Sequence, residues 1–209
     1  MFEQVLPGNT QKYLALLAEK NILPEKTYLA GGTAIALQLG HRISYDLDFF
    51  SYEEFKTEKV LENLKRIDGF KLDRTDWGTI LGNFPSCKFS LFYYQYPLTE
   101  ELKDYLGTKI AGLKDLAASK IGAISSRGTK RDFVDIYYIL KKGNVGSLDD
   151  FLNYYNQRFQ NLAIQKVHIL KSLEYFLDAD KEEDPKMLVG DYSWENVKAF
   201  IGEEVKKLI

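Results

Sequence analysis

The spacing of hydrophobic residues divides the chain into two parts. Residues 1–111 predict short strands that alternate with helices, and residues 112–209 predict helices alone. A helical stripe of apolar side chains, for example, indicates an amphipathic helix over residues 9–20. The other elements expected in the first part are a strand at 27–30, a helix at 33–39 ended by Gly40, a strand at 43–50, and a helix from Ser51 to about Ile67 with a capping box of Ser51 and Glu54.

Residues 70–96 change to a period of two, which is typical of strands with one buried face. Turn signals at 76–78 and 82–85 divide this segment into three antiparallel strands. Two strong helices follow at 113–126 and 129–141, and the remainder after Gly146 is predicted to be helical, with interruptions near residues 184–185 and Gly190. The sum is an α+β (α/β) fold, with a mixed sheet of about five strands, packed helices and a C-terminal helical lobe.

Composition narrows the class of protein. The 209 residues are 45% hydrophobic and 28% charged, so we expect one folded molecule with two lobes. We predict an α/β core at 1–111 and a helical lobe at 112–209 that completes the active site. The net charge of −2 restricts any nucleic-acid contact to a local patch. Short apolar runs, no leader-like start and the single Cys87 predict a cytoplasmic protein with no disulfide and no membrane partner.

Asp46 and Asp48 are the first candidates for chemistry. At positions i and i+2 of a strand they share one face, while Leu47 and Phe49 point the other way into the core. Two adjacent carboxylates repel each other unless a cation lies between them. Mg²⁺ or Mn²⁺, which prefer oxygen ligands, would serve. The alternative is a solvated strand end whose aspartates cap the next helix.

Gly31, Gly32 and Thr33 lie between a predicted strand and a predicted helix. Backbone N–H groups at a helix N-terminus favour a phosphate, and glycine allows the phosphate to approach closely. The alternative is a tight turn with Thr33 as the N-cap. Together with Asp46 and Asp48, this turn predicts the two halves of a nucleoside triphosphate site.

Lys120 lies on an otherwise apolar stripe of the helix at 113–126. There it either reaches solvent or points into a cleft, where it would neutralise triphosphate charge. His41 and Arg42 stand just before the carboxylate strand, where they could touch the triphosphate or the base, although a lone loop histidine usually has no special role.

Residues 127–135 carry the densest basic cluster beside the candidate site, formed by Arg127, Lys130 and Arg131. The cluster suits phosphates of a nucleotide or of an RNA acceptor, or else it is a solvated face. Thr129 and Asp132 have the spacing of a capping box, and Asp135 shares a helix face with Asp132.

Three ordered motifs resemble the AbiEii/AbiGii toxin family of nucleotidyltransferases. They are residues 29–34 with 40–50, residues 113–120 with Ile124, and residues 127–135. The resemblance covers about residues 25–140 and implies a polymerase-β-like nucleotidyltransferase fold that uses an NTP and Mg²⁺. It implies a metal pair at Asp46 and Asp48 and essential roles for Lys120 and Asp135. The residues expected to contact the nucleotide are Gly31, Gly32, Thr33, Arg42, Ser44, Lys120 and Arg131.

The chain departs from the wider superfamily at one position. A third carboxylate is expected on a later strand, within residues 87–92, and Ser90 stands at the plausible position. Activation of an acceptor hydroxyl then falls to Asp135. The resemblance implies transfer of a nucleotidyl group to an RNA (tRNA-like) or protein hydroxyl, by the toxin of a toxin–antitoxin or phage-defence pair with a cognate antitoxin. The alternatives are a protein phosphotransferase at the same site and a nucleotide- or partner-binding module whose catalysis has lapsed.

Overall fold

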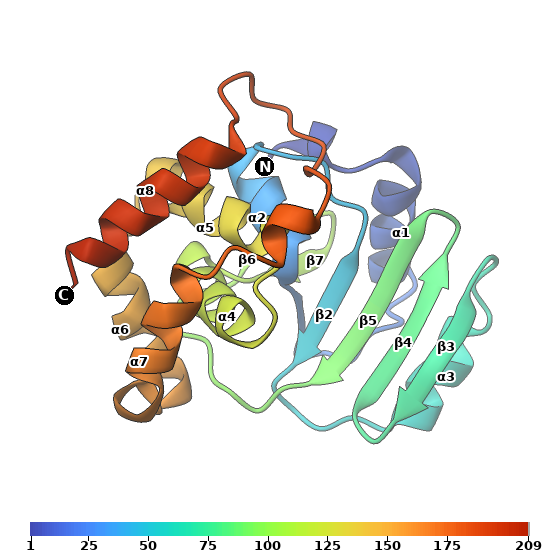
Figure 1. Ribbon diagram of the computed structural model, residues 1–209. Coiled ribbons are helices and arrows are strands. Elements are labelled where there is room, and N and C mark those ends of the chain that lie inside the picture. The colour runs from blue at the N-terminus through green and yellow to red at the C-terminus, as the bar shows by residue number, and fades with distance from the viewer. Residues whose placement is uncertain (209) are drawn as a thin grey trace.

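The computed structural model describes residues 1–208, except the side chain of residue 162, and contains one mixed sheet (Figure 1). The strand order is β3-β4-β5-β2-β1-β7-β6. β2 runs parallel to β5 and β1 runs parallel to β7, whereas the other neighbours are antiparallel. The strands are β1 (Thr27–Leu29), β2 (Leu47–Ser51), β3 (Lys71–Asp76), β4 (Thr79–Phe84), β5 (Cys87–Tyr93), β6 (Lys103–Tyr105) and β7 (Thr108–Ile110).

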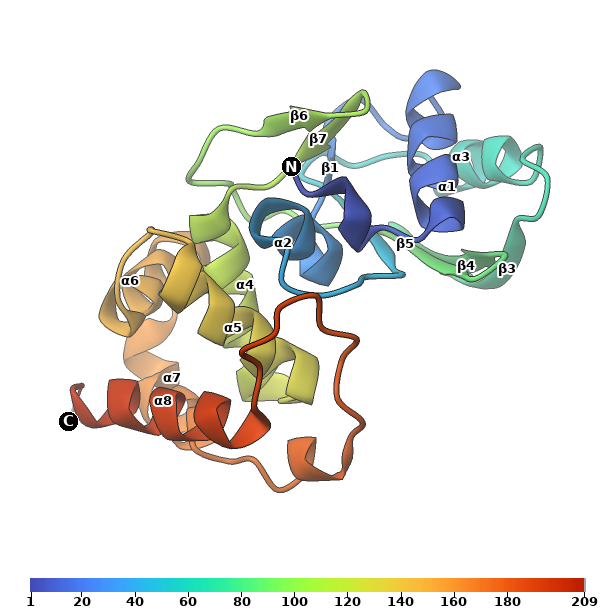
Figure 2. The same ribbon diagram turned by 90° about the horizontal axis from the view of Figure 1, so that it is seen from above.

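Helices cover both faces of this sheet. Figure 2 shows α1 and α3 on one side, and α2 with α4 to α8 on the other. Their bounds are α1 (Gly8–Glu19), α2 (Gly31–Leu39), α3 (Thr57–Leu64), α4 (Leu113–Ser126), α5 (Lys130–Lys142), α6 (Leu148–Phe159), α7 (Leu162–Leu173) and α8 (Trp194–Lys206), with 3₁₀ helices at Glu3–Val5 and Ala179–Lys181. No helix of the described chain is long and apolar enough to cross a membrane.

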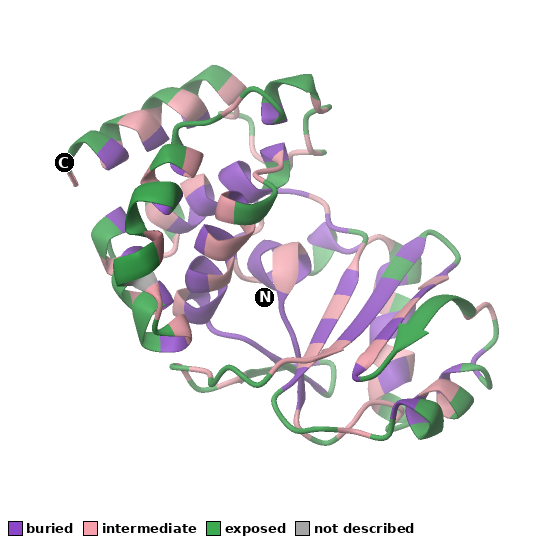
Figure 3. Cartoon of the chain, turned by 60° about the horizontal axis from the view of Figure 1, so that its bottom comes forward, coloured by how far each residue is buried: buried purple, intermediate pink, exposed green. Residues whose placement is uncertain are grey.

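The alternation along β2 places the core and the candidate site on opposite faces of the sheet. Leu47 and Phe49 are fully buried, and the Phe49 ring lies 5.8 Å from that of Phe89 on β5. Asp48 and Phe50 point the other way and are only half-buried. Figure 3 shows the same alternation of buried and partly exposed positions across the central strands. The predicted α+β class, and the opposite orientation of Leu47 and Phe49, are confirmed.

The sheet has seven strands within the described residues, two more than the sequence pattern predicts. The additional β6–β7 hairpin turns at Leu106 and Gly107, whose φ angles are 49° and 75°. Two successive positive φ angles are typical of the tight turns that join two-residue hairpins. The strands have three residues each, which is too short for a period of two to be visible in the sequence.

Several predicted boundaries are wrong; the strand expected at 43–50, for example, begins only at Leu47. Ser51 is the last residue of β2 and donates its hydroxyl hydrogen to the Glu53 carbonyl oxygen, so it caps no helix, and α3 begins only at Thr57. β4 continues through Gly82 to Phe84 instead of turning there. A Cβ at residue 82 would lie 2.6 Å from the Lys71 carbonyl oxygen, so this glycine serves close packing within the sheet.

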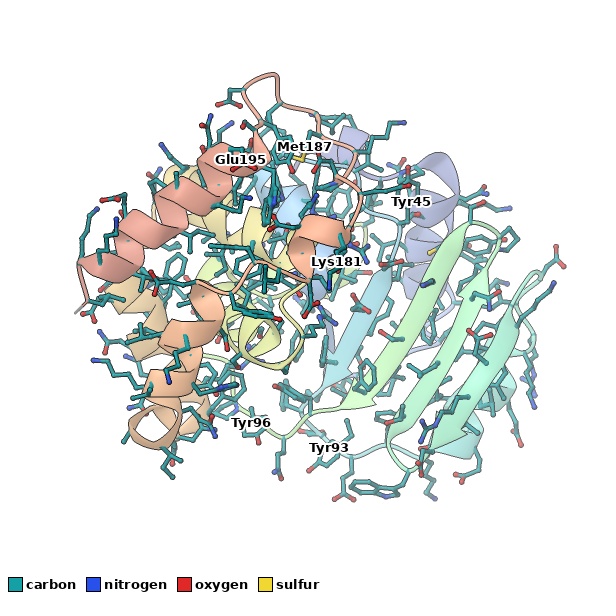
Figure 4. All side chains as sticks on the ribbon, in the orientation of Figure 1. Tyr45, Tyr93, Tyr96, Lys181, Met187 and Glu195 are labelled. Carbon is teal, nitrogen blue, oxygen red and sulfur yellow. The ribbon has the colours of Figure 1, made fainter. Side chains whose placement is uncertain are left out.

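The chain between the 3₁₀ helix Ala179–Lys181 and α8 is extended and returns to the core, as Figure 2 shows. Arg42 and Met187 form an antiparallel β-bridge, and Leu188 N donates to the His41 carbonyl oxygen at 2.9 Å. Met187 therefore lies beside the segment that precedes β2, and Figure 4 labels it on the returning chain. This pairing fixes the backbone just before β2, from which two site residues project.

Candidate active site

Asp46 and Asp48 line one polar hollow of about 180 Å³, together with residues from α2, α4 and α5. Asp48 lies opposite Ser90 in the parallel β2–β5 pairing, and the Ser90 hydroxyl donates to Asp48 Oδ1 at 2.6 Å. Ser90 thus occupies the position beside the acidic pair that the sequence comparison assigned to it. Burial raises the pKa of Asp48, aided by the charge of Asp46 and opposed by the Ser90 hydrogen bond. Asp48 is therefore a carboxylate whose charge is poorly compensated.

Gly31 is required beside Asp48. Its φ angle of +64° is one that glycine adopts readily, and a Cβ there would lie 2.6 Å from Asp48 Oδ2. The neighbouring Gly32 has the same role toward another side chain, since its Cβ would lie 2.1 Å from the Arg42 guanidinium. The two glycines therefore admit a carboxylate and a guanidinium directly against the N-terminus of α2. Thr33 does not provide the predicted N-cap, because α2 begins at Gly31.

Arg42 forms a bidentate pair with Asp135 on α5. Its Nε donates to Oδ1 at 2.8 Å and its terminal nitrogen donates to Oδ2 at 2.9 Å. Lys120 Nζ lies 2.7 Å from Asp135 Oδ2, and His41 Nε2 lies 2.8 Å from Oδ1. Asp135 has no exposed surface. Burial alone would raise the pKa of Asp135. Arg42, Lys120 and His41 instead hold this pKa well below its usual range.

His41 was missed as a site residue by the sequence analysis, and its place beside Arg42 in the first motif was the available signal. Burial lowers the pKa of His41, so the imidazole is neutral at pH 7. A neutral imidazole that donates from Nε2 satisfies Asp135 without adding a further charge. His41 and Arg42 therefore fix α5 against the segment that joins α2 to β2.

Asp132 is the second acidic group of α5, and it does not form the predicted capping box. Thr129 makes no side-chain bond to the helix backbone, and its hydroxyl donates instead to Asp132 Oδ2 at 2.7 Å. Lys120 Nζ donates to Asp132 Oδ1 at 2.7 Å, and Arg127 Nε donates to Oδ2 at 2.9 Å. Lys120 thus points into the interior of the site, between Asp132 and Asp135, and does not reach for solvent.

Thr33 and Ser44 are both buried and link α2 to the segment before β2. Their hydroxyl groups share a hydrogen bond of 2.7 Å, and the Thr33 hydroxyl also donates to the Asp46 carbonyl oxygen. Their contacts hold Asp46 in position.

The basic cluster of residues 127–131 is divided by the fold. Arg131 approaches Asp46 with 3.5 Å between its guanidinium and Oδ2, at the half-exposed mouth of the hollow. Lys130 points away, and its Nζ donates to the Glu182 carbonyl oxygen and lies 3.0 Å from Asp184 Oδ1. Lys130 therefore anchors the extended C-terminal segment and is not part of the phosphate-facing surface that the sequence suggested.

The charges around the hollow balance before any ligand is added. Four basic side chains face four carboxylates here; they are Arg42, Lys120, Arg127 and Arg131, and Asp46, Asp48, Asp132 and Asp135. A triphosphate would bring a large negative charge into this balanced site, so its binding calls for an additional cation. Among residues 1–208, no group of three or more His, Cys, Asp or Glu side chains gathers to hold a metal ion.

The mixed sheet carries two carboxylates at the start of a central strand, and they face a glycine turn and a basic rim. This arrangement defines the class of nucleotidyltransferases. The chain belongs to the AbiEii family of nucleotidyltransferase toxins. The family model, described as "Nucleotidyl transferase AbiEii toxin, Type IV TA system", matches residues 15–110 and 93–199. The protein is therefore a nucleotidyltransferase of the toxin type.

Similar proteins are found both in sequence and in structure. A curated protein of Aquifex aeolicus (strain VF5) is 38% identical over 191 residues, which cover 87% of each chain. The crystal structure of a putative nucleotidyltransferase from Helicobacter pylori gives a TM-score of 0.57 at 16% identity and covers 97% of this chain and 95% of its own. The crystal structure of JHP933 from the same organism gives a TM-score of 0.56 at 18% identity and covers 99% of this chain and 92% of its own. The nucleotidyltransferase toxin MenT4 of Mycobacterium tuberculosis H37Rv gives 0.51 at 16% identity, covering 94% of this chain and 84% of its own. At these identities the structures support the fold.

Proposed function

We propose that this protein transfers a nucleotidyl group from an NTP to a hydroxyl of an RNA (tRNA-like) or protein acceptor, with Mg²⁺ or Mn²⁺ as cofactor. The observation that carries the proposal is the polar hollow, in which Asp46 and Asp48 face the N-terminus of α2 and a set of four basic side chains. The first amides of a helix have no partner within the helix and favour phosphate oxygens. The turn of Gly31, Gly32 and Thr33 is therefore assigned to the phosphates.

The donor set fits a hard divalent cation. Asp46 and Asp48 offer carboxylate oxygens only, and Asp48 Oδ1 takes a hydrogen bond from a neutral hydroxyl, so Oδ2 keeps its lone pairs for a ligand. Mg²⁺ completes its coordination with water and phosphate oxygens, so two protein carboxylates suffice. When bound, the cation supplies charge neutralisation and orientation of the reacting phosphate. The raised pKa of Asp48 is what a carboxylate shows before it receives such a partner.

The basic residues have graded roles in the proposal. Lys120 and Arg42 are nearly fully buried and held by Asp132 and Asp135, so they present fixed positive charge from below the phosphates. Arg127 and Arg131 have side chains that are 63% and 55% exposed, so they face the space in which a triphosphate would bind, and Arg127 is held there by Asp132. Fixed charges organised before the reaction are the more effective ones for transition-state stabilisation.

Asp135 enters the proposal as a positioning residue for Arg42 and Lys120. Both of its oxygens accept from buried bases, and its side chain has no exposed surface. Activation of an acceptor hydroxyl by Asp135 stays a prediction, and it would require one of these bases to leave.

The test is incubation of the protein with α-labelled NTPs, Mg²⁺ and total RNA or protein. Asp48→Asn is the matched inactive control, because it removes the charge and keeps the size of the side chain. We expect label transfer by the wild type and a loss of roughly 100-fold or more in the variant. Equal labelling by both proteins, or none by the wild type, would contradict the proposal. Label transferred from the γ position instead would indicate a phosphotransferase.

Ser90 favours one alternative, a module that binds Mg-NTP without transferring anything. The third acidic position is filled by a hydroxyl that is engaged with Asp48. This alternative predicts that NTP with Mg²⁺ raises the melting temperature while no labelled product forms.

The family membership supports a biological setting for the proposed activity. As the toxin of a toxin–antitoxin or phage-defence pair, the enzyme would act on NTP and acceptor in the cytoplasm and be counteracted by a cognate antitoxin. Growth arrest on expression of the wild type, and none with Asp48→Asn, would support this setting.

A further inference from the structure

Arg131 differs from the other basic side chains around the polar hollow in the carboxylate that it contacts. Arg42, Lys120 and Arg127 each form an ion pair with a carboxylate of α5. Arg131 instead approaches Asp46, one of the two carboxylates assigned to the cation, with 3.5 Å between its guanidinium and Oδ2. Across residues 1–208, Asp46 has no other ion-pair partner. One proposed metal ligand is therefore already in contact with a cation of the chain itself.

The contact between Arg131 and Asp46 is weak enough to be exchanged. The Arg131 side chain is 55% exposed, and that of Asp46 is 31% exposed. Their separation of 3.5 Å is longer than the hydrogen bonds of 2.8 to 3.1 Å that hold Arg42 and Arg127 to the carboxylates of α5. Exposed ion pairs contribute little to stability, because water and salt screen them. Separation of Arg131 from Asp46 therefore costs little.

The backbone of Arg131, in contrast, is held firmly. Arg131 is the second residue of α5 and lies between Lys130 and Asp132, both of which are buried. Lys130 Nζ donates to the Glu182 carbonyl oxygen, and Asp132 Oδ1 accepts from Lys120 Nζ at 2.7 Å. The long Arg131 side chain can therefore change its partner while the first turn of α5 stays in place.

A second partner for Arg131 would lie within the same small space. Gly32, at the N-terminus of α2, lines the same hollow of about 180 Å³ as Arg131 and Asp46. The proposed function assigns the phosphates to this N-terminus, so a guanidinium that leaves Asp46 would meet phosphate oxygens nearby. Arginine suits such an exchange, because its planar guanidinium pairs with carboxylate and with phosphate groups. A guanidinium and a metal ion at the same carboxylate oxygen would repel each other.

On the basis of the proposed function, we propose that Arg131 is an exchangeable counter-ion, which neutralises Asp46 before ligands bind and moves to the triphosphate when the metal ion and the NTP bind together. The exchange couples the two ligands. Displacement of Arg131 from Asp46 opposes binding of the metal ion alone, and a triphosphate that accepts the guanidinium removes this opposition. Each ligand therefore binds more tightly in the presence of the other, by a factor to which Arg131 contributes.

The first experiment measures the affinity of the full chain for Mn²⁺ alone, from the electron paramagnetic resonance signal of the free ion. Asp46 loses its counter-ion in Arg131→Gln, so we expect this variant to bind Mn²⁺ roughly 2- to 5-fold more tightly than the wild type, which corresponds to the loss of one exposed ion pair. Arg74→Gln is the charge-matched control, because Arg74 is 71% exposed and pairs with Asp76 on the edge strand β3. Its affinity should equal that of the wild type. No gain in Arg131→Gln, or an equal gain in both variants, would overturn the proposal.

Two further variants separate the Arg131 contact from the general charge of the hollow. Arg131→Lys keeps a cation that can make the same exchange, so it should bind Mn²⁺ more nearly as the wild type does. Arg127→Gln removes a cation of the same hollow whose partner is Asp132, and its gain should be smaller than that of Arg131→Gln. A gain as large as that of Arg131→Gln would show an effect of local charge alone and would overturn the proposal. Unchanged urea unfolding of Arg131→Gln guards against misfolding as the explanation.

The closing experiment measures the coupling itself, as the ratio of NTP affinities with and without Mn²⁺ in calorimetric titrations. We expect this ratio to be roughly 2- to 5-fold larger in the wild type than in Arg131→Gln. Inorganic tripolyphosphate should show the same difference, because the exchange involves phosphate oxygens and not the base. An equal ratio in both proteins, while Mn²⁺ still raises the NTP affinity of the wild type and not that of Asp48→Asn, would overturn this proposal alone. A wild type whose NTP affinity does not respond to Mn²⁺ would overturn the proposed function as well.

Discussion

Asp132 and Asp135 on α5 and Asp46 and Asp48 at β2 are two pairs of aspartates around one hollow, yet their surroundings are opposite. Asp132 and Asp135 are completely buried and accept from several basic side chains, which hold the pKa of each below its usual range. Asp48 accepts one hydrogen bond from a neutral hydroxyl, and its pKa is raised. The negative charge of the α5 pair is compensated by basic side chains of the same chain, and this pair is suited to stabilise the fold. The β2 pair is only weakly compensated, since Asp48 has a neutral hydroxyl as its hydrogen-bond partner and Asp46 has one long contact to Arg131, and it is suited to bind a cation.

The largest expected effect comes from the compensated pair. Asp135→Asn leaves Arg42 buried without its carboxylate partner and Lys120 with Asp132 alone, so we expect a loss of about 3–5 kcal/mol in the free energy of unfolding. Urea unfolding without Mg²⁺ measures it. Asp46→Asn is the control, since Asp46 is half-exposed with one long contact to Arg131, and it should change stability by less than about 1 kcal/mol. Similar losses in both variants would remove the distinction between the pairs.

The glycines that admit these side chains give a smaller effect. In Gly32→Ala the new methyl group would overlap the Arg42 guanidinium, and we expect a cost of about 1–3 kcal/mol in stability with weaker binding of tripolyphosphate. Gly202→Ala in α8 meets no atom within 4 Å and should instead gain up to about 1 kcal/mol from helix propensity. Thermal unfolding of both variants checks the contrast. A neutral Gly32→Ala would show that Arg42 is not held against α2.

The pH dependence of stability separates the pairs by sign. Asp132 and Asp135 have lowered pKa values in the folded state, so their contribution is present above the unfolded pKa of about 3.9 and is lost as pH falls below it. Asp48, with a raised pKa, contributes the opposite slope, since its stabilisation is lost as pH rises through its folded pKa. Urea unfolding between pH 3 and 6 should show a slope that Asp135→Asn flattens and Asp48→Asn steepens, each by up to about 1.4 kcal/mol per pH unit. Two shifts of the same sign would contradict the assignment.

The sequence correctly predicted the helices and strands that have a strongly periodic hydrophobic pattern. Two strong helices became α4 and α5, Gly40 ended α2 with a φ of +68°, and the alternation of β2 placed Leu47 and Phe49 in the core. The three-residue strands β6 and β7 were missed because pairing, and not a local pattern, defines them.

The site was predicted in its residue types more than in its connections. Lys120 and Asp135 were named from the motifs, but no local signal shows that Asp135 joins residues 93 and 94 positions away, Arg42 and His41. Lys130 was grouped with its neighbours because it is close in sequence, whereas the helix turns it toward Asp184. The contact between Tyr96 and Phe159 was not predicted, since these two rings come together only in the folded chain.

The most direct test of the claim that Asp46 and Asp48 await a cation is calorimetric titration of an NTP with and without Mg²⁺, into the wild type and Asp48→Asn. The account predicts that Mg²⁺ tightens binding to the wild type by roughly 100-fold, as a metal that neutralises phosphate charge would. It also predicts that Asp48→Asn loses that advantage while it remains folded. The account would be contradicted if the wild type bound the NTP equally well with and without Mg²⁺. It would also be contradicted if Mg²⁺ tightened NTP binding equally in the wild type and in Asp48→Asn.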